Sequence, residues 1–215
     1  MIGIRYPLPM ETEDQNPNVR EYLDRLRRRL TPADAVARPT PNKGRAAAVL
    51  APLIVRGDSI DVLYTRRSDR IASHRGQVAF PGGGFDRRDP DLMATALRET
   101  HEEVGVEPAA IQVLGSFAGR RTFSTNIDVT PFVGVIEGMP ELRADPREVA
   151  EIFTVPLAAL SDPRYRGRHR WNRGGQDSGY PAILYGGQVI WGLTFHLTLT
   201  LLELLDGDGG RRARG

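Results

Sequence analysis

The sequence contains no cysteine. This absence excludes disulfide bonds and thiolate metal sites, and it is compatible with a reducing compartment. Long hydrophobic runs are also missing: no segment approaches the roughly 20 apolar residues that span a bilayer, and the N-terminus lacks the apolar core of a signal peptide. We therefore expect a cytoplasmic protein with no membrane partner.

Lysine is almost absent as well. Lys43 is the only one, so arginine supplies nearly all of the positive charge, and the formal net charge is +2. This balance is no argument for nucleic-acid binding, which needs basic residues clustered on one face, and we expect no nucleic-acid partner. With 215 residues, 40% of them hydrophobic, the chain can bury one sizeable core, and its length allows one domain or at most two.

Residues 82–106 carry the strongest signal, which is a run of three glycines, a capped helix and a closing glycine. Asp89 suits the N-cap position and Pro90 the first helical position, while Gly105 can take the left-handed conformation that ends a helix. The pattern predicts a helix over residues 90–104. Its apolar stripe, which we expect to face the core, comprises Met93, Ala96, Leu97, Thr100 and Val104.

The other side of this helix is acidic. Glu99 and Glu103 are four residues apart and lie one above the other, with Glu102 a step round the cylinder. Like charges at this spacing repel unless a cation compensates them, and carboxylate oxygens are the ligands that Mg²⁺ prefers. An ordinary solvated helix face is the alternative interpretation. Arg98, four residues before Glu102, is placed to hold that carboxylate.

Residues 98–106, R-E-T-H-E-E-V-G-V, resemble the R-E-U-x-E-E-x-G-U core of the Nudix hydrolase box, in which U is aliphatic. Thr100 departs from the aliphatic position. The loop before the core is one residue longer than in the box and carries Asp89 where the box has Glu, so we interpret Asp89 as a helix cap and leave it out of the metal set. The resemblance implies an α/β Nudix fold, a mixed β-sheet sandwiched between α-helices, and an enzyme that hydrolyses phosphoanhydride bonds.

The resemblance also implies a divalent cation, Mg²⁺ or Mn²⁺, at the site. We expect Glu99 and Glu103 to hold it, with the Gly83 carbonyl as a further ligand. Glu102 either completes the metal cluster or accepts the proton of the attacking water, and which glutamate acts as the base stays open. Arg98 completes the catalytic set.

A second motif precedes the box and resembles the extra motif of the coenzyme A pyrophosphatase branch. The matching residues are Thr65, Arg67, Ser68, Gly76, Phe80, Pro81, Gly82 and Gly83. Leu63-Tyr64 replaces the usual paired leucines, and Ala72 stands where the motif has an arginine, which Arg70 or Arg75 is near enough to replace. Arginine can grip phosphate oxygens bidentately, and backbone N–H groups near glycines can join it. We therefore expect the substrate to be bound by Arg67, Ser68, Arg70, Gly82 and Gly83, while His74 is either a ligand contact or a structural residue.

The rest of the chain divides into three regions. Residues 1–45 are expected to form an N-terminal arm and an amphipathic helix, residues 46–205 the Nudix domain, and residues 206–215 a flexible basic tail. Within the first region, we expect a poorly packed arm over residues 1–16, the helix over residues 17–30 and a linker over residues 31–45. Strands are predicted over residues 46–55, 60–65, 111–119 and 129–136, with a turn at residues 56–59 and a polar connection at residues 120–128 that overhangs the site.

Three later segments complete the pattern. Glu148 and Glu151, in and after the charged loop at residues 141–150, are candidates for a further metal ligand or a base, or else plain surface charges. Residues 161–181 are rich in arginine and glycine with interspersed aromatics, and are interpreted as a lid, a loop that stacks on adenine, or a flexible segment. Residues 185–205 contain the closing, leucine-rich helix.

These features imply a small-molecule nucleotide substrate. We expect coenzyme A or a derivative, cut to phosphopantetheine and adenosine 3′,5′-bisphosphate. One alternative is another Nudix activity, on ADP-ribose, dinucleoside polyphosphates or nucleoside triphosphates, and the departure at Ala72 favours it. The other is a non-catalytic nucleotide-binding module, although such modules usually lose the glutamates of the box. Homodimers are common in the superfamily, but the sequence identifies no interface.

Overall fold

A mixed β-sheet forms the centre of the computed structural model, which describes residues 3–5, 19–39, 45–70, 75–122, 126–173 and 176–206. Along the main path of the sheet lie β1 (Gly3–Arg5), β9 (Val149–Pro156), β3 (Ser59–Arg67), β2 (Arg45–Arg56), β8 (Ile127–Glu137) and β6 (Gln112–Ser116). Three short strands attach to it: β4 (Val78–Ala79) pairs with β3, β5 (Gly82–Gly84) with β2, and β7 (Arg120–Arg121) with β8.

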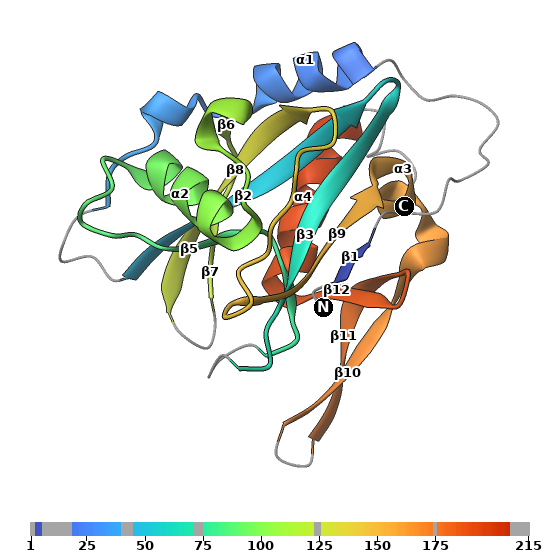
Figure 1. Cartoon of the computed structure of the whole chain (residues 1–215). Coiled ribbons are helices and arrows are strands. Elements are labelled where there is room, and N and C mark those ends of the chain that lie inside the picture. The colour runs from blue at the N-terminus through green and yellow to red at the C-terminus, as the bar shows by residue number, and fades with distance from the viewer. Residues whose placement is uncertain are drawn as a thin grey trace.

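Helices cover both faces of this sheet. One hydrophobic cluster joins the sheet to α1 (Val19–Arg29), α3 (Leu157–Ser161) and α4 (Gly192–Asp206), and a second joins it to α2 (Leu92–Val104). Figure 1 shows α2 and α4 on opposite faces of the sheet. This arrangement confirms the predicted fold class, a mixed sheet between helices. No helix among the described residues combines the length and the apolar character that a membrane crossing requires.

Strand β2 shows why the sequences of the predicted strands are almost continuously apolar. Its side chains alternate between the two clusters, with Leu53 and Val55 on the α4 side and Leu50 and Ile54 on the α2 side. A strand that is covered on both faces has no solvent side to carry polar residues. It pairs in parallel with β8 and in antiparallel with β3 through the predicted turn at residues 56–59. The central strands therefore agree with the prediction.

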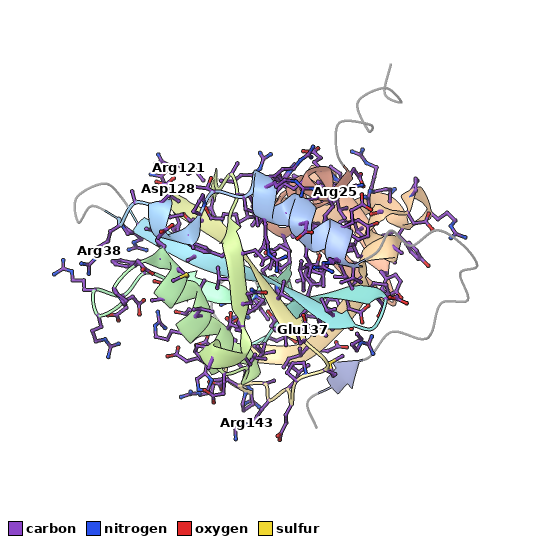
Figure 2. All side chains as sticks on the ribbon, turned by 90° about the horizontal axis from the view of Figure 1, so that it is seen from above. Arg25, Arg38, Arg121, Asp128, Glu137 and Arg143 are labelled. Carbon is purple, nitrogen blue, oxygen red and sulfur yellow. The ribbon has the colours of Figure 1, made fainter. Side chains whose placement is uncertain are left out.

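Within the first 45 residues, the described parts are more closely attached than expected. Residues Gly3–Arg5 form an edge strand parallel to β9, so they are not a poorly packed arm. Helix α1 buries Leu23 and Leu26 in the shared core, as its periodicity predicts. Figure 2 shows Arg25 on α1. Its side chain donates to the carbonyl of Leu205 at the end of α4 (3.0 Å). Whether residues 46–205 fold as a separate unit stays a prediction.

Residues 161–181 are mostly strand, and this corrects the expectation of a loop, while a role as a lid stays a prediction. Strands β10 (Arg166–Arg173), β11 (Gln176–Tyr185) and β12 (Gln188–Trp191) form a separate antiparallel sheet. Ile183 and Ile190 are fully buried on its inner face, while Tyr180 and Leu184 are exposed on the other. Figure 1 shows the β10–β11 hairpin projecting from the body of the protein. Where the structure describes its side chains, the exposed residues of this hairpin include Arg168, Arg170 and Tyr180.

Several expectations concern residues outside the described ranges. They are Ala72 and His74 in the basic loop, most of the N-terminal arm, and the tail after Asp206. For the polar connection at residues 120–128, the structure describes β7 and a bidentate pair between Arg121 and Asp128 (2.7 and 2.6 Å), which Figure 2 shows at the edge of the molecule.

Candidate active site

The helix that carries the acidic residues begins two residues later than predicted. Asp91, and not Asp89, is its N-cap: the Asp91 carboxylate accepts a hydrogen bond from the backbone N–H of Ala94 (2.8 Å). Pro90 therefore lies outside the helix. Gly105 ends the helix in the left-handed conformation (φ 79°), as predicted. Both aspartates are good capping residues, so spacing alone did not distinguish them.

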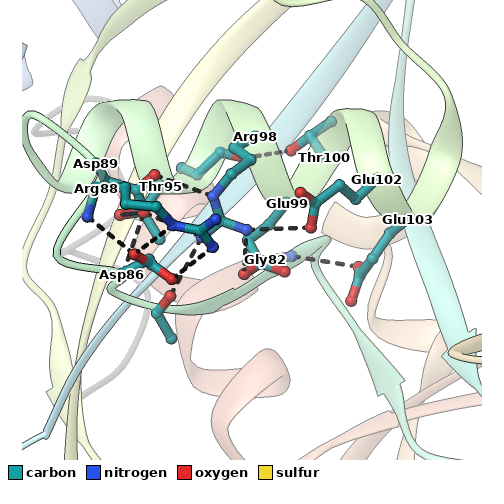
Figure 3. A network of polar contacts seen from close by, with 12 residues as sticks. Gly82, Asp86, Arg88, Asp89, Thr95, Arg98, Glu99, Thr100, Glu102 and Glu103 are labelled. Atoms are coloured by element: carbon teal, nitrogen blue, oxygen red, sulfur yellow. Dashed lines mark hydrogen bonds and ion pairs between the residues drawn. The ribbon is translucent and has the colours of Figure 1, made fainter.

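Asp89 has a different partner, which the sequence analysis missed. It is buried, and its two carboxylate oxygens accept from Nε and Nη2 of Arg98, each at 3.0 Å. The Thr95 hydroxyl donates to the same carboxylate (2.8 Å). These hydrogen bonds, above all the one from Arg98, lower the pKa of Asp89. Figure 3 shows Arg98 at the centre of this network.

The third nitrogen of the Arg98 guanidinium faces the predicted metal ligands. Nη1 donates to Glu99 Oε1 (2.9 Å) and to Glu102 Oε2 (3.1 Å). One arginine, fixed from behind by Asp89, thus orients two carboxylates of the acidic face (Figure 3). Burial raises the pKa of Glu99, although the hydrogen bond from Arg98 opposes this shift.

Glu103 is the most deeply buried of the three glutamates, with 4% of its surface exposed. Burial raises its pKa to about 8, and the charges of Glu99 and Glu148 add to the shift. Two groups oppose it: Arg67 lies with Nη1 3.8 Å from Glu103 Oε1, and the backbone N–H of Gly82 donates to Oε2 (3.3 Å). The predicted apolar stripe does pack against the core, since Ala96, Thr100 and Val104 are buried and Met93 and Leu97 are partly buried against the same cluster. The burial of Glu103 was not predicted.

The glycines are required by close approach. A Cβ at position 83 would lie 2.5–2.6 Å from the carboxylate of Glu99, and one at position 82 would lie 2.4 Å from the carbonyl of Ala48. Strand β5 therefore passes between β2 and α2 with no room for side chains there. A Cβ at position 84 would have no neighbouring atom of the described residues within 4 Å.

The direction of the glycine carbonyls follows from the strand register. Gly83 is paired with Ala48, and the bonds Phe85 N–H to Ala46 O and Leu50 N–H to Pro81 O on either side make this a hydrogen-bonded pair. The polar groups of Gly83 thus point toward β2, whereas the N–H of Gly82 reaches Glu103. Because N–H and C=O of one strand residue point to the same side, the geometry favours the Gly82 carbonyl over that of Gly83 as the backbone oxygen next to the acidic residues.

The loop before β9 brings further acidic residues to the helix. A pocket of about 180 Å³ is lined by Glu99, Glu102, Glu103, Asp145, Arg147 and Glu148. The backbone N–H of Asp145 donates to the carbonyl of Glu103 (3.2 Å), and the N–H of Ser68 donates to the carbonyl of Glu148 (2.8 Å). The loop is thus tied to α2 on one side and to the basic segment on the other. Asp145 and Arg147 were missed, and no local pattern marks them.

Glu148 and Glu151, which the sequence left equivalent, are separated by the fold. Glu148 lines the pocket. Glu151 is buried within β9, where it accepts from Arg66 Nε (3.2 Å) and from the side-chain amide of Gln188 (3.0 Å). Glu151 therefore joins the main sheet to the small one, and it does not line the pocket.

The upstream motif holds the basic segment between β3 and β4. Arg67 and Gln77 pair through the backbone (2.9 Å), and Gly76 turns the chain with φ 65°. The side chains of Arg66 and Arg67 point to different sides, as adjacent residues of a strand do, and reach Glu151 and Glu103 respectively. Within the described residues, the buried Nε of Arg67 has no hydrogen-bond partner.

The other two expected substrate-binding residues of this segment differ in exposure, because Ser68 is buried. The Ser68 hydroxyl accepts from the backbone N–H of Arg70 (3.2 Å), and Arg70 itself is exposed. Tyr64 explains one departure from the motif, because it is fully buried, stacks on Phe80 and donates to or accepts from Thr198 (3.0 Å).

The residues present suit a hard divalent cation. Carboxylates and backbone carbonyls are its preferred ligands, and a pocket of this size lies below the ~300–1,000 Å³ that encloses a drug-sized ligand. No three acidic or histidine side chains of the described ranges already converge as a metal site. Burial is the main cause of the raised pKa values of Glu99 and Glu103, and neighbouring carboxylates add to it, so a cation bound beside them would offset part of the cost of ionising them.

Comparisons with known proteins point to one family. A family model described as NUDIX domain matches residues 44–173. A protein of Photorhabdus laumondii, named uncharacterized Nudix hydrolase NudL, is 41% identical over 175 residues, which cover 81% of this chain and 90% of that protein. A protein of the same name from Yersinia enterocolitica is 42% identical over 164 residues, or 74% and 81% of the two chains. A solved MutT/nudix family protein from Enterococcus faecalis superposes with a TM-score of 0.48 at 19% identity, covering 88% of this chain and 69% of that one.

Proposed function

The chain belongs to the Nudix hydrolase family, and from that premise we propose that it hydrolyses the diphosphate of coenzyme A or an acylated derivative. Water adds to one phosphorus of the diphosphate and the bridging P–O bond breaks. The products are phosphopantetheine, or its acyl form, and adenosine 3′,5′-bisphosphate. The proposal of hydrolysis is supported above all by one observation, that Glu103 is buried beside Glu99 and faces the glycine strand and Arg67.

The acidic residues and Arg98 have separate roles in this reaction. A divalent cation, held by Glu99, Glu103 and Glu102 with a carbonyl of the glycine strand, would neutralise phosphate oxygens and lower the pKa of a bound water. Arg98 keeps Glu99 and Glu102 in place. Glu148 is the candidate acid from outside the helix, to hold the cation or to accept the proton of the water.

Substrate binding is assigned to the basic segment. Arg67 has donors to spare for a phosphate oxygen, and Gly82 and Gly83 allow a phosphate to approach the backbone closely. Ser68 and Arg70 contribute from the adjoining turn. Positioning and charge stabilisation supply most of the catalysis in phosphoryl transfer, so no covalent nucleophile is needed.

The coenzyme A assignment depends on the upstream motif, in which Thr65, Arg67, Gly76 and Phe80 match the coenzyme A branch. Ala72 departs from that motif and is the reason to keep a second candidate, a Nudix activity on ADP-ribose, dinucleoside polyphosphates or nucleoside triphosphates.

A substrate panel tests the proposal. Purified protein with Mg²⁺ or Mn²⁺ is given coenzyme A, acetyl-coenzyme A, ADP-ribose, diadenosine polyphosphates and nucleoside triphosphates, and the products are identified by mass. We expect adenosine 3′,5′-bisphosphate from the coenzyme A compounds, and no product from the folded Glu103→Gln variant. Cleavage of another compound with coenzyme A untouched would replace the substrate. Binding without cleavage of any compound would favour a non-catalytic module.

A further inference from the structure

The chain contains the same short turn twice, Asp145-Pro146-Arg147 and Asp162-Pro163-Arg164. In both, the aspartate accepts from the backbone N–H of the arginine (2.9 and 2.8 Å) and from its guanidinium (2.6 Å in each). Both arginine side chains are largely exposed, at 85% and 78%. The two turns are therefore equivalent as local structure.

Their surroundings differ. Arg147 lines the pocket formed with Glu99, Glu102, Glu103 and Glu148, and it is the one basic residue among the described residues that line it. Arg164 lies in the short 3-10 helix Pro163–Tyr165 that precedes β10, and it does not line that pocket. Any effect that is particular to Arg147 must come from its place beside the acidic residues, because the turn itself is duplicated.

The guanidinium of Arg147 is held by one edge. Nε and Nη2 donate to the Asp145 carboxylate (3.0–3.1 and 2.6 Å). Within the described residues, no hydrogen bond is formed by Nη1 of Arg147, although a guanidinium carries five N–H donors in a fixed fork. Asp145 thus orients the side chain in advance, and the second edge is directed away from Asp145. That edge has the geometry that arginine uses to bind a phosphate bidentately.

We propose that Arg147 binds a phosphate of the substrate's diphosphate and that Asp145 is its positioning residue. The inference rests on the proposed function. It adds a residue that belongs neither to the Nudix box nor to the motif upstream of it. A diphosphate approaching the carboxylates of this pocket is repelled by them, and a bound cation offsets only part of that repulsion. Arg67 supplies positive charge from β3, and Arg147 supplies it from the loop before β9.

The test compares Arg147→Gln with Arg164→Gln, which removes the same charge from the duplicate turn. Steady-state kinetics are measured on whichever phosphoanhydride the wild type cleaves. We expect Arg147→Gln to raise KM by about 10-fold to 100-fold, the usual effect of losing a charged hydrogen-bonding partner, with a smaller change in kcat. Arg164→Gln should match the wild type. Arg147→Lys should fall between them, because lysine keeps the charge but loses the fork, and Asp145→Asn should raise KM less than Arg147→Gln does.

A binding measurement separates this inference from the proposed function. Calorimetry with Mg²⁺ and methylenediphosphonate, a diphosphate analogue that is not hydrolysed, is run on the wild type and on both glutamine variants. Weaker binding in Arg147→Gln alone supports the assignment, even if the wild type cleaves none of the compounds and the proposed function fails. Equal KM and equal binding in the two glutamine variants would overturn the assignment, and so would a wild type that does not bind the analogue.

Discussion

Replacing Asp89 by Asn tests whether the buried contact behind Arg98 organises the acidic face. The substitution keeps the shape of the side chain but removes the charge that accepts both Arg98 Nε and Nη2 at 3.0 Å. We expect a less stable protein with lower kcat, because Arg98 would lose the contact that holds it against Glu99 and Glu102.

The expected size follows from burial. The Asp89 side chain is 7% exposed and that of Arg98 30%. Breaking a buried ion pair by removing one partner costs roughly 3–5 kcal/mol. Because Arg98 is partly exposed and Asn can still accept from Thr95, we expect a smaller loss than this range, about 2–3 kcal/mol. For a chain of this length that lowers Tm by ~5–10 °C.

The assay is thermal and urea unfolding of the metal-free protein, with Asp86→Asn as the matched control. Asp86 forms a similar pair with Arg88 in the same loop (2.9 Å), but both side chains are exposed, so we expect little change. Equal effects of the two substitutions would refute the reasoning, since burial would then not distinguish the pairs.

The pH dependence gives a second readout. The pKa of Asp89 is lowered in the folded protein by its bonds to Arg98 and Thr95. Its contribution to stability is therefore present above its unfolded pKa of about 4 and is lost as pH falls toward the folded value. The acid-induced loss of stability should be smaller in Asp89→Asn than in the wild type. Parallel pH profiles for the two proteins would contradict the assignment.

Three further predictions concern other positions. Gly83→Ala should displace Glu99 and reduce kcat, since the new Cβ would lie 2.5 Å from its carboxylate, while Gly84→Ala, with nothing within 4 Å, should retain activity; equal kcat values would show that the close approach is unimportant. Burial raises the pKa of Glu103 from 4.5 to about 8, so the metal-free protein should lose stability as pH rises between these values. The Glu103→Gln variant should not show this pH-dependent loss. A wild-type stability that increases with pH over this range would contradict the burial argument. Tyr64→Phe should lower the free energy of unfolding by about 1 kcal/mol through the lost bond to Thr198, whereas Tyr180→Phe, at an exposed position, should not; calorimetric Tm values decide between them.

Local patterns in the sequence predicted those elements whose cause is local. The apolar runs that became β2, β3 and β8 are strands covered on both faces, so hydrophobicity alone marks them. The end of α2 at Gly105 follows from the conformational freedom of glycine. The spacing of Glu99, Glu102 and Glu103 on one helix placed three acidic residues together before any tertiary contact was known.

Other features depend on contacts between distant segments. Asp89 and Asp91 are equally good caps, and only the contact between Asp89 and Arg98 of α2 assigns them different partners. The hairpin formed by β10 and β11 resembled a loop because its strands carry few residues that need burial. The spacing of the box says nothing of how deeply Glu103 is buried, which depends on β5 and Arg67 packing against it.

The sequence by itself determined the family, the central strands, and the helix that bears the acidic residues, since each is written in residues close together in the chain. Only the tertiary structure decided that the backbone N–H of Gly82 reaches Glu103, that Glu148 joins the pocket while Glu151 does not, and that Arg147 lies beside the acidic residues while its duplicate Arg164 does not. The physical reason is that identical local turns and neighbouring glutamates acquire different environments only when β2, β5, α2 and the loop before β9 pack together.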